Sequence, residues 1–198
     1  MRSKSLSETP SERLYFLLDF VAVLVYTVAM KFDYKSVYEK NAAFYERHPI
    51  AKKALLFSNL ALTGVFFLAY FALVIYAAVA LETKDIIKIL AIPALCVALV
   101  TLLRILFARP RPYSQAGANI TPILHKKSRD KESFPSRHLA CAFVIATVFF
   151  PYLTGAGICL TVLGCVLGYV RFALGVHYPT DLLGGAALGG ICGLLLLI

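Results

Sequence analysis

A few ionisable residues stand in the otherwise apolar C-terminal half of this chain. From Leu139 to the C-terminus, only Arg171 and Asp181 carry a charge at neutral pH. His177 lies between them, four residues before Asp181, and His138 directly precedes the apolar block. Ionisable groups in such surroundings are costly to bury, so each is a candidate for function.

Arginines at Arg104, Arg111 and Arg171 predict a strongly cationic pocket. Guanidinium groups bind phosphate oxygens in bidentate geometry and stay charged when partly desolvated. The pocket is therefore predicted to bind a phosphate group or another small polyanion.

Carboxylates are scarce in the segments around these arginines, where only three occur: Asp130, Glu132 and Asp181. A magnesium or paired-metal site needs several oxygen ligands. We therefore expect no metal and no cofactor, and phosphoryl transfer then needs a nucleophile from the protein.

Histidine can supply that nucleophile. An imidazole attacks phosphorus if a carboxylate holds its other ring nitrogen, and Asp181 is placed to hold His177 in this way. His138 is then the general acid for the leaving oxygen and later the base that activates water.

Composition points to a membrane protein. The chain has 198 residues, of which 60% are hydrophobic, a formal charge of +9 and a mean hydropathy of +0.76. Such a chain is too apolar for an ordinary soluble domain. Long uncharged blocks between charged loops predict an all-α, polytopic bundle of six transmembrane helices in a single domain, over about 14–30, 55–80, 87–106, 138–153, 156–173 and 181–198.

The connections between these helices place the candidate residues on one membrane face. Two spans separate the loop at 107–135 from the loop at 172–180, so two crossings bring the chain back to the same side. Residues 32–53 mix aromatic and basic side chains and predict an amphipathic segment at the interface, with a solvated loop as the alternative. In the last span, Gly185, Gly189 and Gly193 permit close helix packing.

Three sequence blocks resemble the signatures of the type 2 phosphatidic acid phosphatase superfamily. They are Arg104-x6-Arg111-Pro112, Pro135-Ser136-Arg137-His138 and Arg171-x5-His177-x3-Asp181. The resemblance implies that His177 forms a phosphohistidine, that Asp181 is its partner and that His138 protonates the leaving group. It also implies a phosphate-binding set of Arg104, Arg111, Ser136, Arg137 and Arg171.

Two positions depart from the family pattern. Arg104 stands where the family usually has lysine, which keeps the charge. Arg137 stands where glycine usually lets the backbone approach the phosphate, so its side chain could instead meet a second phosphate or a lipid headgroup. Arg109 lies outside the blocks, and we expect it to contact headgroups or solvent.

These features predict a metal-independent phosphatase for an anionic membrane lipid: phosphatidate, phosphatidylglycerophosphate or undecaprenyl diphosphate. The alternatives are a lipid phosphotransferase with the same site and an inactive polyanion-binding or transport protein. No nucleic-acid partner is expected, and the oligomeric state is left open.

The family resemblance implies a multi-pass protein of the cell membrane with its site on the extracytoplasmic face. The distribution of lysine and arginine among the loops favours the opposite orientation. Labelling of cysteines introduced into residues 113–134 in intact cells distinguishes the two orientations.

Overall fold

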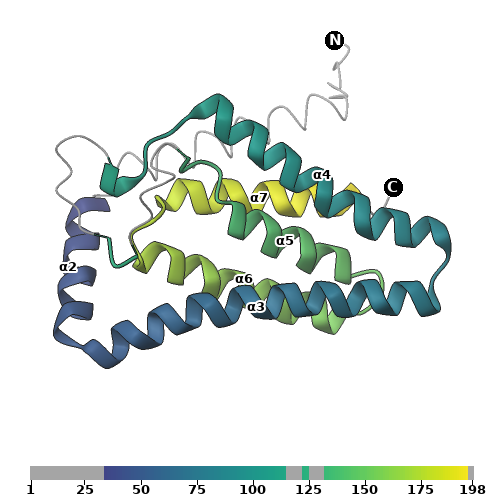
Figure 1. The fold of residues 1–198 in the computed structure, drawn as a ribbon, viewed down its shortest axis with the longest axis horizontal. Helices are drawn as coiled ribbons and strands as arrows, with labels where there is room; N and C mark the ends of the chain where they lie inside the picture. Colours follow the sequence, from purple (N-terminus) through teal and green to yellow (C-terminus); the bar gives the residue numbers. More distant parts are fainter. Residues whose placement is uncertain (1–33, 115–121, 125–131, 196–198) are drawn as a thin grey trace, which may run out of the picture. The chain divides into compact units, whose positions relative to one another are not determined.

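The computed structural model describes residues 34–114, 122–124 and 132–195, and every regular element in these ranges is helical (Figure 1). The helices are α2 (Tyr34–Arg47), α3 (Pro49–Ala80), α4 (Thr83–Phe107), α5 (Arg137–Phe149), α6 (Thr154–Ala173) and α7 (Pro179–Leu194), with a short 3-10 turn, η1 (Pro112–Ser114). The all-α prediction is confirmed for these residues. The expected span at about 14–30 lies outside them.

Three of the described helices, α3, α4 and α6, are long and apolar enough to cross a membrane. By contrast, α5 has 13 residues and α7 has 16, and a transmembrane helix needs about 20. The chain is thus a helical membrane protein, but the predicted count of six spans is not confirmed.

Several helices begin or end away from the predicted bounds. The helix expected at 55–80 already begins at Pro49, because proline suits the first turn of a helix. The helix expected at 138–153 ends at Phe149, shortly before Pro151, which lacks the backbone N–H that a continuing helix requires. The helix expected at 181–198 begins at Pro179.

The end of α4 and the start of α5 set the positions of two site segments. Ala108 adopts a left-handed conformation, with a φ of 40°, and Pro110 and Pro112 prevent the helix from resuming. The chain then leaves α4 with Arg109 and Arg111 outside the helix. Ser136 has extended backbone angles and directly precedes α5.

Helix α5 lies at the centre of the bundle and packs against α4, α6 and α7 (Figure 1). Its contact with α7 is backbone to backbone at two glycines. A Cβ atom at Gly185 would lie 2.4 Å from the carbonyl oxygen of Ser136, and one at Gly189 would lie 2.3 Å from that of Ala140. The close approach predicted for the glycine-rich segment is confirmed, and it draws the start of α7 against the start of α5.

Helix α2 crosses one end of this bundle, next to the loop that follows α6 (Figure 1). Tyr38 of α2 is buried there, and its ring leaves no room for a side chain at Gly175, where the φ angle is +73°. Asn41 donates to the carbonyl oxygen of Ala173 at 3.5 Å. The predicted segment at 32–53 therefore contains a helix that supports the loop before His177.

Candidate active site

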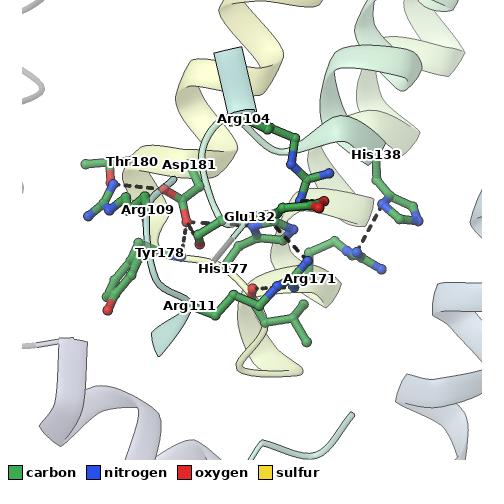
Figure 2. Close-up of polar contacts among 12 residues, drawn as sticks. Arg104, Arg109, Arg111, Glu132, His138, Arg171, His177, Tyr178, Thr180 and Asp181 are labelled. Carbon is green, nitrogen blue, oxygen red and sulfur yellow. Dashed lines mark hydrogen bonds and ion pairs between the residues drawn. The ribbon is translucent and has the colours of Figure 1, made fainter. Parts of the chain in front are cut away.

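The two loops that the sequence places on one face do meet. The backbone N–H of Ser136 donates to the carbonyl oxygen of Asp181 at 2.9 Å, and the Ser133 hydroxyl donates to the Asp181 carboxylate. The expectation that two intervening helices return the chain to one site is confirmed. The site forms where the starts of α5 and α7 meet the end of α6 (Figure 2).

His177 lies in the loop between α6 and α7 and is 1% exposed. Its Nδ1 is 3.6 Å from Oδ2 of Asp181, just beyond hydrogen-bond distance, so Nε2 is the ring nitrogen directed away from the carboxylate. Burial, together with the charges of Arg171 and Arg111, lowers the pKa of His177 to about 4, although Asp181 opposes the shift. The imidazole is therefore neutral near pH 7, with a lone pair available on one nitrogen.

Asp181 is fully buried in the first turn of α7, and its carboxylate is well satisfied. Oδ2 accepts a hydrogen bond from the backbone N–H of Tyr178 at 2.9 Å and one from Ser133. Oδ1 accepts one from Nη1 of Arg109 at 2.8 Å. A buried charge needs such compensation, and these contacts fix the carboxylate beside His177.

Arg109 makes two further contacts around this carboxylate. Its Nη1 donates to the Thr180 hydroxyl at 2.9 Å, and its guanidinium lies 4.4 Å from the centre of the Tyr178 ring. The expectation that Arg109 contacts solvent holds in part, since 38% of its side chain is exposed, but its guanidinium also binds the Asp181 carboxylate. Pro110 and the left-handed Ala108 turn the chain so that Arg109 faces the start of α7.

Three other guanidinium groups gather on the opposite side of His177 (Figure 2). Arg104, Arg111 and Arg171 are between 2% and 5% exposed. Arg104 and Arg111 both donate to the carbonyl oxygen of Glu132, and Arg111 also donates to that of Val176 at 3.0 Å. Sequence reasoning placed all three arginines in one pocket, and the structure brings them together.

Two carboxylates lie near the guanidinium groups of the site, those of Glu132 and Asp181. The Glu132 carboxylate is 4.0 Å from Nη2 of Arg104, with 45% of its side chain exposed. Asp181 is already engaged by Arg109. Guanidinium groups gathered in a buried pocket suit the oxygens of a bound anion.

Buried polar atoms of the site without a hydrogen-bond partner among the described residues include the Ser136 hydroxyl, Nε of Arg171 and Nδ1 of His177. Such atoms are rare in folded proteins and call for a ligand or a water molecule. Ser136 also directly precedes α5, whose N-terminal N–H groups attract negative charge. These groups suit phosphate oxygens.

His138 is held by the same cluster. Its Nδ1 lies 3.0 Å from Nη2 of Arg171, while Nη1 of Arg171 donates to Oδ1 of Asn59 at 3.0 Å. Arginine can only donate, so Nδ1 of His138 is the acceptor and its proton is on Nε2. Figure 2 thus shows two sets of contacts: Arg109 and His177 both meet Asp181, and Arg171 meets His138.

Arg137 is the first residue of α5. It lines an apolar cavity beside α5, together with His138. In the part of the chain that the structure describes, no hydrogen bond joins it to the residues around His177, so its membership of the phosphate-binding set stays a prediction.

Three residues near the site were missed by sequence reasoning: Asn59, Arg109 and Ser133. The position of Arg109, two residues before Arg111 in a proline-flanked segment, could have indicated it. Asn59 lies in an apolar helix distant in sequence, and only the packing of α3 on α6 brings it to Arg171.

No group of three or more histidine, cysteine or acidic side chains lies close enough to hold a metal ion in the part of the chain that the structure describes. The positive charge at the site comes from arginine side chains.

Comparison with known proteins agrees with this arrangement. A model described as the PAP2 superfamily matches residues 85–198. "Putative undecaprenyl-diphosphatase YbjG" of Escherichia coli (strain K12) is 39% identical over 88 residues, which are 43% of this chain and 42% of that protein. This chain thus matches less than half the length of that relative.

Two solved structures are similar in fold. The crystal structure of Aquifex aeolicus LpxE is 26% identical, with a TM-score of 0.56 over 76% of this chain and 87% of that one. The first transmembrane PAP2-type phosphatidylglycerolphosphate phosphatase from Bacillus subtilis is 22% identical, with a TM-score of 0.59 over 90% of this chain and 92% of that one.

Proposed function

Because the chain belongs to the PAP2 superfamily, we propose that it is a metal-independent lipid phosphate phosphatase that acts through a phosphohistidine. One observation carries the proposal: the buried His177 lies between the Asp181 carboxylate and three buried arginines. A nucleophile next to a cationic pocket suits transfer of a phosphoryl group.

The first step forms a bond from Nε2 of His177 to phosphorus and breaks the bond to the lipid oxygen. His138 gives a proton to that leaving oxygen, so the lipid departs as an alcohol or, from a diphosphate, as a monophosphate. Asp181 stabilises the imidazolium that forms. In the second step His138 takes a proton from water, which attacks phosphorus and releases His177.

The arginines neutralise the phosphoryl oxygens in both steps. Arg104, Arg111 and Arg171 supply the positive charge that metal ions supply in other phosphoryl-transfer enzymes. An incoming phosphate competes for Arg171 with its present partner, His138. Releasing Nδ1 of His138 allows that ring to take up the proton that it later donates.

The proposed substrate is phosphatidate, phosphatidylglycerophosphate or undecaprenyl diphosphate. The family resemblance supports a location in the cell membrane with the site on the extracytoplasmic side. The name of the Escherichia coli relative makes undecaprenyl diphosphate the first substrate to test.

The proposed function predicts that detergent-solubilised protein releases inorganic phosphate from at least one of these lipids in the presence of EDTA. The reason is that arginines, and no metal, balance the phosphate charge. Phosphate release is measured from each lipid in mixed micelles, with and without EDTA. An activity that EDTA abolishes and magnesium restores would contradict the proposal.

Replacement of Arg109 by alanine is expected to lower kcat by about tenfold to a hundredfold, as for other groups that orient a catalytic partner. KM should stay nearly constant, because Arg109 contacts Asp181 and lies outside the phosphate-binding cluster. The acid limb of the kcat/KM profile should move to higher pH, since Arg109 favours the ionised carboxylate. Arg109→Lys should recover part of kcat.

The matched control is Arg47→Ala, which removes an exposed arginine at the end of α2. It should change neither kcat nor the pH profile. If Arg109→Ala lowers kcat only because less of the protein is folded, and the pH profile does not shift, then Arg109 has only a structural role.

A further inference from the structure

A cavity of about 550 Å³ lies between α3, α4, α5 and α6, beside the candidate site. Along α5 its lining runs from Arg137 and His138, at the start of the helix, to Ile145. The cavity therefore extends from the site into the part of the bundle formed by the membrane-crossing helices α3, α4 and α6.

The lining beyond His138 is mostly hydrocarbon, with contributions from all four helices. It includes large apolar side chains that converge on the same space: Phe66, Phe67, Leu90, Pro93, Ile145 and Leu167. A ligand inside this cavity would make many contacts with hydrocarbon and few with polar groups, so the cavity favours an apolar occupant.

The hydroxyl groups in the lining are already engaged. The Thr63 hydroxyl donates to the carbonyl oxygen of Asn59 at 2.7 Å. The Tyr70 hydroxyl donates to the carbonyl oxygen of Ile89 at 3.2 Å. Pro93 lacks the N–H that would normally bond Ile89, four residues before it, so the tyrosine satisfies this carbonyl. Both hydroxyls are thus turned towards the backbone.

His138 belongs both to the cavity and to the arginine cluster. It lines the cavity, and its Nδ1 is 3.0 Å from Nη2 of Arg171. In the proposed reaction His138 protonates the leaving oxygen, so it must lie next to the oxygen that joins the phosphate to the leaving group. The leaving group of a lipid phosphate is its hydrocarbon part, and the cavity is on that side of His138.

From this placement, and resting on the proposed function, we propose that the cavity binds one hydrocarbon chain of the substrate. A methylene group occupies about 30 Å³, like a water molecule in the liquid, so 550 Å³ holds about 18 methylene groups. Two such chains would need about twice this volume. The substrate class is therefore a lipid phosphate for which a single alkyl or isoprenoid chain suffices.

A chain-length series tests the proposal. The substrates are single-chain alkyl phosphates from 8 to 24 carbons, compared in mixed micelles of constant composition. This range spans about half to four-thirds of the chain length that the cavity holds. We expect kcat/KM to rise with chain length up to about 18 carbons and then level off. Addition of a second chain, as in phosphatidate compared with lysophosphatidate, should change kcat/KM by less than about threefold.

A cavity-filling variant gives the matched test. Ala94 lines the cavity from α4 and is otherwise exposed, so Ala94→Phe should fill space there without disturbing a packed core. Excluding about two methylene groups should lower kcat/KM for the 18-carbon phosphate about tenfold. Ala91→Phe, at an exposed residue of α4 that does not line the cavity, is the control.

Hydrolysis of p-nitrophenyl phosphate, which has no chain, separates binding of the chain from chemistry. It should be unchanged in both variants. An equal loss with this substrate in Ala94→Phe, or a rate independent of chain length, would overturn the single-chain proposal. Absence of turnover with every substrate would overturn the proposed function, and the cavity proposal with it.

Discussion

Replacement of His177 by asparagine is expected to lower kcat for phosphate release by at least about 10⁴-fold. The side chain is buried next to the Asp181 carboxylate, which is placed to stabilise the imidazolium that forms when the ring attacks phosphorus. Asparagine keeps a polar group near Asp181 but cannot attack phosphorus. Phosphate release from a lipid substrate measures the loss.

A second measurement shows whether His177 carries the phosphoryl group. Substrate labelled in the transferred phosphate is mixed with enzyme and quenched in alkali, in which a phosphohistidine survives. Label should remain on the wild-type protein and on the His48→Asn control, since His48 is an exposed histidine outside the site. Label retained by His177→Asn would contradict the proposed nucleophile.

Replacement of His138 by alanine should have the second largest effect, a loss in kcat of about 10²- to 10⁴-fold with lipid substrates. An alkoxide is a poor leaving group, so its departure depends on the proton from His138. The p-nitrophenolate ion needs no proton. With p-nitrophenyl phosphate, the variant should therefore still transfer the phosphoryl group to His177 at close to the wild-type rate.

The second step, in which His138 activates water, stays slow in this variant. We expect a burst of p-nitrophenol equal to the amount of enzyme, followed by slow turnover, as measured by stopped-flow absorbance. The loss of Arg171's contact with His138 leaves its bond to Asn59 in place, so the phosphate site should persist. An equal loss of the first turnover with both kinds of leaving group would exclude His138 as the acid.

The sequence by itself singled out the residues that we propose for the chemistry. Arg104, Arg111 and Arg171 were recognisable because charge is rare among apolar blocks, and His177 with Asp181 because they stand four residues apart. The same pattern determined the helical class, since long uncharged blocks have few other ways to satisfy their backbone in lipid. Counting helices then placed both loops on one face.

Only the tertiary structure decided what supports those residues. The contacts of Arg109 with Asp181, and of Asn59 with Arg171, join segments that are 72 and 112 residues apart. No local pattern encodes such distances. They depend on how α7 packs on α5 through Gly185 and Gly189, and on where α3 crosses α6.

The cavity beside His138 was equally invisible in the sequence. Apolar residues of a membrane helix can face lipid, another helix or an internal space, and hydropathy is the same in each case. The packing of four helices decides which of them surround a space large enough for a hydrocarbon chain. Residue type and spacing thus determined the reactive groups, whereas packing decided their orientation and the space left for a ligand.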